Sequence, residues 1–173
     1  MVQHPDPILS SKAGHFELPD DRKTAMEVID KLTAAAAEIA RVHDFAKGMG
    51  VAAPQIGLAH AAAVVYQPGK PEPIVLLNPT IIESSSETDL QYEGCLSFFD
   101  VRCRVPRPRQ IHVEHVDLEG QRHITVFDDG LARLVAHEID HLDGILCLDR
   151  LPAGESPIPV KEYKGTGATW SYK

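Results

Sequence analysis

The sequence has little that would support a disulfide framework, a membrane span or a surface for polyanions. It contains three cysteines, an odd number, so we expect free thiols in a reducing compartment. Its apolar runs, such as residues 61–66, are far shorter than the roughly 20 residues that a membrane-spanning helix needs. A formal net charge of -8 disfavours a surface that binds nucleic acid or an anionic membrane.

The N-terminal segment, residues 1–5, has no basic residues followed by an apolar stretch, which is the pattern of a secretory signal. We therefore expect a cytoplasmic protein. Hydrophobic residues make up 43% of the chain and charged residues 24%, as is ordinary for a folded protein. The length suits a single domain over residues 1–173 that buries a core without disulfide bonds.

An amphipathic helix is predicted to begin after Asp20 and Asp21, whose carboxylates favour the positive N-terminal end of a helix. Apolar residues then recur at steps of three and four, as on the buried side of a helix: Ala25, Val28, Ile29, Leu32, Ala36, Ile39 and Val42. Gly48 is the predicted stop. The pattern indicates a helix that covers the core.

Residues 48–57 have a different character, because glycine and small residues alternate there and Pro54 follows. Such a segment makes a poor helix and a poor central strand. We predict a loop whose backbone comes close to a ligand, since glycine permits a positive φ or close contact. A dinucleotide site is disfavoured, because no helix with a polar N-cap follows the glycines.

Short strands separated by turn signals are predicted for the middle of the chain. The expected strands cover residues 61–66, 74–77, 80–82, 101–105, 111–118 and 122–127. Asn78 and Pro79 are expected to form a turn, and Glu119 and Gly120 the turn of a hairpin. Turns at such short intervals indicate antiparallel pairing.

A His-Glu-x-x-His pattern begins at His137, in a second predicted helix that follows Asp128-Asp129. His137 and His141 are one turn apart on the same face, so both imidazoles reach a single metal ion. Glu138 beside them is able to handle the protons of a water molecule. The buried stripe of this helix is expected to be Leu131, Val135, Ile139 and Leu142. The two histidines then lie at the border of the core, in a half-buried site.

A catalytic metal typically takes three protein ligands and keeps one position open, so a third ligand is needed. Cys95 follows Gly94 at the end of a strand-like segment, where a side chain is presented at an edge. Cys103 and Cys147 occur in apolar runs and are expected to be core thiols. Cys95 is therefore the preferred third ligand. A structural zinc site is disfavoured, because it would need a fourth.

Three separated segments resemble the signature motifs of peptide deformylases, in the family's order and at similar spacing. They are residues 48–55, 93–97 and 137–142, with the sequences GMGVAAPQ, EGCLS and HEIDHL. The resemblance implies an α+β fold, with antiparallel β-sheets around a central metal-binding helix and an N-terminal packing helix. It also implies a hydrolase that removes the formyl group from the N-terminal formylmethionine of nascent polypeptides and releases formate. The tail after Leu151 has no counterpart in this resemblance.

The same resemblance implies a ligand set and an ion. Cys95, His137 and His141 would bind one divalent metal, Fe²⁺ in the native enzyme, with Zn²⁺, Ni²⁺ or Co²⁺ as alternatives. Thiolate and imidazole ligands suit all of these metals and do not choose among them.

Catalytic and substrate-binding roles are also implied by the resemblance. Glu138 would take a proton from the attacking water and return it to the departing amine. The Gln55 side chain and the backbone N–H of Leu96 would stabilise charge on the formyl oxygen. Gly50 would hydrogen-bond the substrate as an added strand, and Leu134 would line the pocket for the methionine side chain.

The chain departs from the family's usual pattern at two places. Ala136 stands where a glutamine is usual, and Phe98-Phe99-Asp100 follow the cysteine motif. An inactive or re-purposed metal- or peptide-binding module is therefore the alternative, although it would have no need of Glu138. Cys95 and Gln55 disfavour an ordinary zinc peptidase. The expected partner is the formylmethionyl nascent peptide, with the ribosome as a further candidate and with no nucleic acid or membrane.

Overall fold

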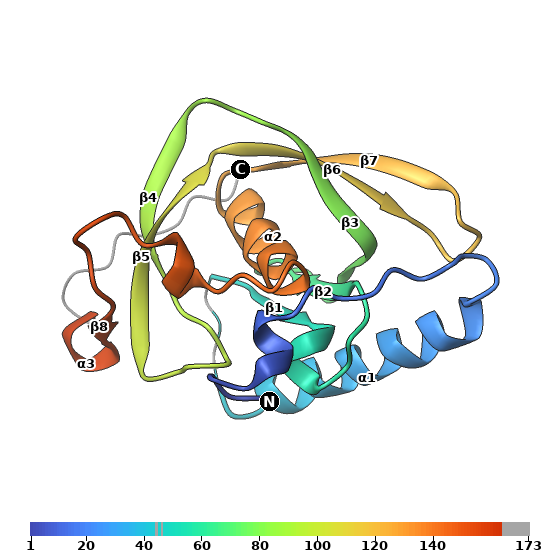
Figure 1. Ribbon diagram of the computed structural model, residues 1–173, viewed down its shortest axis with the longest axis horizontal. Helices are drawn as coiled ribbons and strands as arrows, with labels where there is room; N and C mark the ends of the chain where they lie inside the picture. The colour runs from blue at the N-terminus through green and yellow to red at the C-terminus, as the bar shows by residue number, and fades with distance from the viewer. Residues whose placement is uncertain (44, 46, 164–173) are drawn as a thin grey trace.

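The computed structural model describes residues 1–43, 45 and 47–163. Its long helices are α1, Arg22–Ala40, and α2, Asp129–Leu142. Two antiparallel sheets lie around α2, so the α+β fold expected from the sequence is confirmed (Figure 1). Across the described ranges, no helix combines the length and the apolar character needed to cross a membrane.

The larger sheet has five strands in the order β1-β2-β3-β6-β7, and every neighbouring pair is antiparallel. Its strands are β1 (Met49–Ala52), β2 (Ala62–Tyr66), β3 (Ile74–Ser84), β6 (Gln110–Val116) and β7 (Arg122–Asp128). The smaller sheet has the order β4-β5-β8, formed by β4 (Thr88–Glu93), β5 (Val101–Pro108) and β8 (Ile158–Pro159). Short helices cover Pro7–Ser10, Ala53–Ile56, Cys147–Arg150 and, as α3, Val160–Tyr163.

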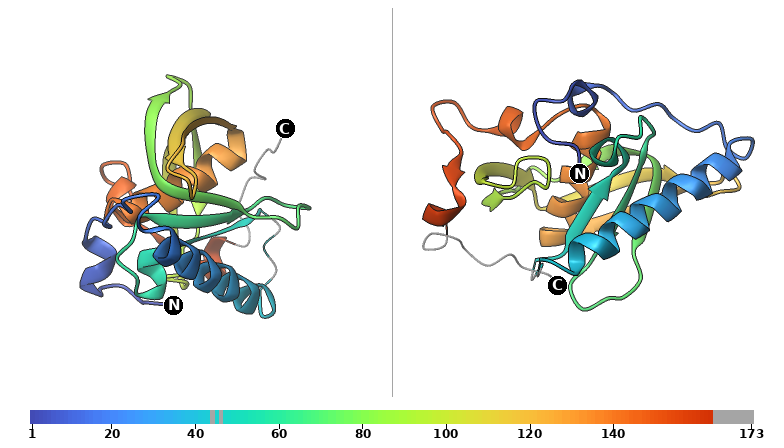
Figure 2. Two further views of the ribbon diagram at one scale, coloured as in Figure 1. Left: turned by 90° about the vertical axis from the view of Figure 1, so that its right-hand side faces the viewer. Right: turned by 90° about the horizontal axis from the view of Figure 1, so that it is seen from below.

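The five-stranded sheet lies between the two long helices, with α1 on one face and α2 on the other (Figure 2). Successive side chains of a strand point to opposite faces, and β2 shows this directly. Val64 belongs to the core cluster that includes α1, whereas Val65 belongs to the cluster that includes α2. Because both faces of the sheet are covered, β2 is apolar along its whole length.

Helix α1 buries the predicted stripe but ends earlier than expected. Ala25, Val28, Leu32 and Ala36 are buried, which confirms the helix and its inward face. The helix stops at Ala40 and not near Gly48, and Val42 is 73% exposed. Because Val42 of the predicted stripe is exposed, a further helical turn there would bury little apolar surface to offset its ordering entropy.

Residues 48–57 are not a loop, so this prediction was wrong. They form strand β1 and then a single turn of 3-10 helix, Ala53–Ile56. A strand tolerates glycine poorly in the middle of a sheet, but β1 is the edge strand and pairs only with β2 among the described strands. Pro54 falls after the strand, where no ladder hydrogen bond is lost.

Strand β3 joins two segments that were predicted as separate strands. The chain continues through Asn78 and Pro79, and the register with β6 shifts between Leu77 and Thr80. Asn78 has a φ of 49°, so the predicted turn signal produces an irregularity inside one strand. The hairpin turn between β6 and β7 is confirmed, since Asp117 N–H donates to the Gln121 carbonyl at 3.0 Å.

Candidate metal centre

Helix α2 carries two different faces, and both are buried. One face packs through Ala132, Val135, Ala136 and Ile139 into the apolar cluster on the five-stranded sheet. The other face carries Arg133, His137 and Asp140 toward side chains of β4 and β5. Ala136 therefore lies on the apolar side of the helix. In this chain that position packs against the sheet and does not contribute a polar group to the site.

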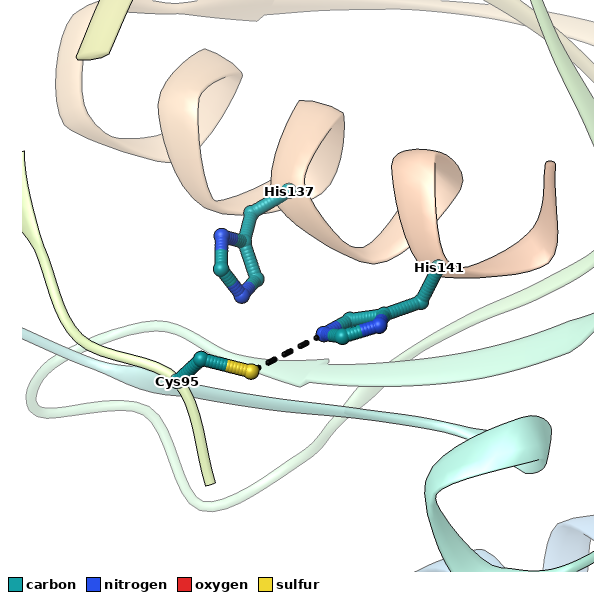
Figure 3. A group of neighbouring side chains, drawn as sticks. All are labelled: Cys95, His137 and His141. Carbon is teal, nitrogen blue, oxygen red and sulfur yellow. Dashed lines mark hydrogen bonds between the residues drawn. The ribbon is translucent and has the colours of Figure 1, made fainter. Parts of the chain in front are cut away.

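Cys95, His137 and His141 converge on one point between α2 and the end of β4 (Figure 3). Their ligand atoms all lie within 4.8 Å of one another, and Cys95 Sγ is 3.2 Å from His141 Nε2. The three residues are 4%, 7% and 1% exposed, so the site is more enclosed than the half-buried position predicted for the histidines. No other such group of histidine, cysteine or carboxylate side chains occurs among the residues described.

Glu93, at the end of β4, fixes the orientation of the first histidine. His137 Nδ1 donates to Glu93 Oε2 at 3.0 Å, which leaves Nε2 as the nitrogen available to a metal. Burial alone would raise the pKa of Glu93, but the Arg107 charge and the hydrogen bonds from His137 and Arg107 hold it far below its usual range. Glu93 is therefore a carboxylate in the folded protein. Sequence reasoning missed this role, although Glu93 stands in the motif two residues before Cys95.

A buried network of charges extends from Glu93 to the far end of α2. Arg107 donates to Glu93 through Nε at 2.9 Å and through Nη2 at 3.0 Å, and to Asp140 through Nη1 at 2.5 Å. Arg133 donates to Glu93 Oε1 at 2.7 Å, and Arg150 donates to Asp140 Oδ1 at 2.6 Å. The alternation of signs keeps each buried charge partnered. No spacing in the sequence indicates these contacts, because they join β4, β5 and α2.

Glu138 lies on the cavity side of α2, next to His137. Burial raises the pKa of its carboxyl to about 7. Within the described part of the chain, Glu138 Oε2 has no hydrogen-bond partner. A Cβ on Gly50 would overlap the Glu138 carboxyl, so any other residue at this point of β1 would displace that side chain. The glycine that sequence reasoning assigned to close contact is thus in contact with the proposed base.

The Gln55 side chain is held with its amide nitrogen toward Cys95. Its Oε1 accepts from Ala52 N–H at 2.9 Å, and this donor identifies the oxygen of the amide. The Nε2 group then lies 3.7 Å from Cys95 Sγ and 3.4 Å from Ser97 Oγ. Gln55 is therefore a fixed, buried donor at the candidate site.

A cavity of about 310 Å³ opens onto this arrangement. Every site residue expected from the sequence lines it except His141, which is 1% exposed. Leu96 and Leu134 add apolar surface near Glu138. The cavity thus combines a three-ligand metal site, an unpartnered carboxylate oxygen, an amide donor and apolar surface, which is the arrangement needed for hydrolysis at a carbonyl.

The donor set fits a catalytic divalent metal. One thiol and two imidazoles suit Fe²⁺, Zn²⁺, Ni²⁺ and Co²⁺. Three ligands leave a coordination position open, as catalytic sites require. The hydrogen bond from His137 to Glu93 supplies the outer support that metal-binding histidines typically have.

Comparisons with known proteins agree with this geometry. A family model described as polypeptide deformylase matches residues 1–156. The peptide deformylase of Dictyoglomus thermophilum is 39% identical over 157 residues, which cover 91% of this chain and 94% of that protein. A class I type b peptide deformylase from Acinetobacter baumannii is 33% identical, with a TM-score of 0.76 over 86% of this chain and 96% of that one. Another structure of that enzyme, with Met-Ala-Ser bound, is 31% identical, has a TM-score of 0.76 and covers 87% and 96%.

Proposed function

The chain belongs to the polypeptide deformylase family, and on this premise we propose which of its residues carry the reaction. It is an enzyme that removes the formyl group from nascent polypeptides. Cys95, His137 and His141 hold the divalent metal, and Glu138 moves the protons. The observation that supports this assignment best is the convergence of three metal-ligand side chains beside a buried carboxylate oxygen without a partner.

A divalent metal bound by these residues supplies Lewis acidity, which polarises a carbonyl and lowers the pKa of water. Fe²⁺ is our proposal for the native ion. The chain's own part is to hold the two imidazoles and the thiolate in place, with Glu93 fixing the His137 ring. The enclosure of the site strengthens each of these electrostatic interactions.

Glu138 acts as the base and then as the acid. It takes one proton from the water that attacks the formyl carbon, and it gives that proton to the amine nitrogen as the C–N bond breaks. Formate and the free methionyl amine are the products. The close packing of Gly50 against the Glu138 carboxyl fixes the position of this group beside the substrate path.

Gln55 and Leu96 act on the formyl oxygen. The Gln55 Nε2 group and the Leu96 backbone N–H donate to this oxygen as negative charge develops on it. The first residues of the chain hold Gln55 and Leu96 in place. Val2 N–H donates to the Gln55 carbonyl at 2.8 Å, and Gln3 Nε2 donates to the Leu96 carbonyl at 3.0 Å. Both donors are therefore positioned before the substrate arrives.

The substrate's first residue fits the remaining features of the cavity. Gly50 hydrogen-bonds the extended peptide backbone as it adds to the edge of β1 that no described strand pairs with, and Leu134 lines the pocket for the methionine side chain. We further propose that residues 1–173 act as one catalytic domain in the cytoplasm. The ribosome is a proposed partner that delivers the nascent chain.

Replacement of Glu138 by Gln tests this assignment. We expect the variant to bind the metal as the wild type does, because Glu138 is not a ligand, while formate release from a formyl-Met-Ala-Ser peptide falls by about 10²- to 10⁴-fold. Metal analysis and a formate assay measure both quantities in anaerobically prepared protein. Glu27→Gln, on the exposed face of α1, is the matched control. Full activity in Glu138→Gln would remove Glu138 from the mechanism, and a metal-loaded wild type without formate release would favour the inactive module.

A further inference from the structure

The C-terminal arm, β8 and α3, reaches the rim of the cavity. Strand β8 pairs with β5, with Pro159 opposite Val101, and Val160 N–H donates to the Asp100 carbonyl at 2.9 Å. In Figure 1 the arm lies beside β5, at the side of the molecule away from α1. This pairing brings Tyr163 to the cavity, where its ring meets Tyr92 edge-on with centroids 5.4 Å apart. The family match ends at residue 156, so this arm lies outside it.

Tyr163 joins the two sides of the cavity. Its hydroxyl is 2.8 Å from the ammonium of Lys47, which lies just before β1 on the side of the five-stranded sheet. The guanidinium of Arg102, on β5, lies 5.9 Å from the centre of the same ring. One tyrosine therefore stands between two cations that both line the cavity.

Arg102 places its charge close to the path of a substrate. Its guanidinium occupies the space that a Cβ on Gly94 would fill, directly beside the proposed ligand Cys95. Its hydrogen bonds go to the carbonyls of Phe99 and Val101. In the described part of the chain no carboxylate forms an ion pair with Arg102, so its positive charge is not neutralised by a partner there.

The direction of the bound peptide follows from the order of residues along β1. Gln55 follows β1 in the chain and Lys47 precedes it. A peptide whose formyl group lies at Gln55 and whose backbone adds to β1 at Gly50 runs back toward Lys47, and is antiparallel to β1. In an extended peptide, alternate side chains share a face and lie about 7 Å apart. The third residue therefore faces the cavity, as the methionine does, and lies near Lys47.

We propose that Tyr163 and the two cations beside it, Lys47 and Arg102, form one wall of the substrate groove and select an acidic side chain at the third residue of the formylated peptide. This inference rests on the proposed function and adds a substrate preference to it. Among the described residues, the carboxylates that line the cavity are Glu93 and Glu138, and both lie beside His137. Lys47 and Arg102 thus place two positively charged side chains along the cavity of a chain whose net charge is -8.

Two formylated tripeptide amides test the preference: formyl-Met-Ala-Asp-NH₂ and formyl-Met-Ala-Lys-NH₂. The amide removes the terminal carboxylate, so only the third side chain differs in charge. We expect kcat/KM for the Asp peptide to exceed that for the Lys peptide by about 5- to 10-fold at low salt, mostly through KM, and we expect the ratio to shrink as salt is added. Equal kcat/KM values for the two peptides would overturn the proposal.

Variants assign the preference to the wall. Lys47→Glu should reverse the order of the two peptides, whereas Lys31→Glu, the same charge change on the exposed side of α1, should leave the wild-type ratio intact. Tyr163→Phe keeps the ring and removes the hydroxyl that holds Lys47, so the ratio should fall toward about 2-fold. If thermal melting shows that Lys47→Glu is unfolded, Lys47→Gln replaces it and should reduce the preference without reversing it, because Arg102 keeps its charge.

The outcomes separate this inference from the function on which it rests. Formate release from neither peptide, and none from formyl-Met-Ala-Ala-NH₂, would contradict the proposed function. Formate release from all three at equal efficiency would leave that function standing and refute the selective wall. A wild-type ratio in folded Lys47→Glu would also refute it.

Discussion

Helix α2 packs on the five-stranded sheet through one face and on β4 and β5 through the other, and the two faces bury different chemistry. On the first, Val135 and Ile139 contact the apolar side chains of β2, β3, β6 and β7. On the second, His137 and Asp140 meet carboxylates and guanidinium groups. Burial of the apolar face stabilises the folded state in proportion to the apolar area that is removed from water. The charged face loses solvation that its ion pairs only partly restore.

The difference indicates what each face contributes. Apolar contacts are non-directional, so they hold α2 in place but do not select which way an imidazole nitrogen points. The hydrogen bond between His137 and Glu93 fixes the imidazole to one orientation, and Arg107 fixes Glu93 in turn. The charged face thus specifies the geometry of the proposed metal ligands, and the apolar face offsets its desolvation cost. Substitutions on the two faces should therefore change different quantities.

Glu93→Gln should change stability and metal affinity most, because Glu93 lies at the centre of the charged face. It leaves Arg107 and Arg133 buried with less compensating charge and loses the carboxylate that orients His137. We expect the free energy of unfolding to fall by about 3 to 5 kcal/mol and the metal affinity to fall about 10- to 100-fold. Denaturant unfolding and metal titration measure the two changes.

Glu87→Gln is the control, since Glu87 pairs with Arg109 at the surface, where its side chain is 71% exposed. Neither stability nor metal affinity should change measurably in this variant. The proposed difference between the two faces would be wrong if Glu93→Gln had the wild-type denaturant midpoint and bound its metal as tightly as the wild type.

Leu76→Ala tests the opposite face. Leu76 lies on β3, is fully buried and belongs to the apolar cluster beneath α2. Its truncation leaves a cavity and should lower the free energy of unfolding by about 2 to 5 kcal/mol. Metal affinity and kcat should stay at wild-type values at temperatures where the variant is folded. Loss of metal from a stably folded Leu76→Ala would show that the apolar face also sets the ligand geometry.

The same contrast explains how much of the site was predictable from the sequence. The histidine pair and Glu138 are close together in the chain, and helical periodicity places them on adjoining faces. Cys95 was predicted from its place after a glycine and from the family resemblance. Glu93 and Arg107 escaped prediction as parts of the site, because their contacts with α2 depend on how β4 and β5 pack in three dimensions.

Fold prediction failed where tertiary contacts override local preference. Residues 49–52 look unsuited to a strand, yet they form β1, because the edge of the sheet accepts Gly50 and the Glu138 carboxyl fills the space that a side chain would take. In the first helix, the apolar pattern continues to Val42, but the helix ends at Ala40 and Val42 is exposed. By contrast, the β6–β7 hairpin was predictable from its turn residues alone.

Arg150→Ala should give the smallest effect on the charged face and shows how the network weakens toward solvent. The Arg150 side chain is 46% exposed, whereas its partner Asp140 is 7% exposed and keeps its hydrogen bond from Arg107 after the substitution. Asp140 therefore stays paired, and the free energy of unfolding should fall by less than about 1 kcal/mol, with metal affinity unchanged. Denaturant unfolding of Arg150→Ala and Glu93→Gln under the same conditions shows which variant loses more stability. If Arg150→Ala lowered the free energy of unfolding as much as Glu93→Gln, the exposed end of the network would stabilise α2 as strongly as its centre. The orientation of His137 would then depend on all of these ion pairs and not on Glu93 alone.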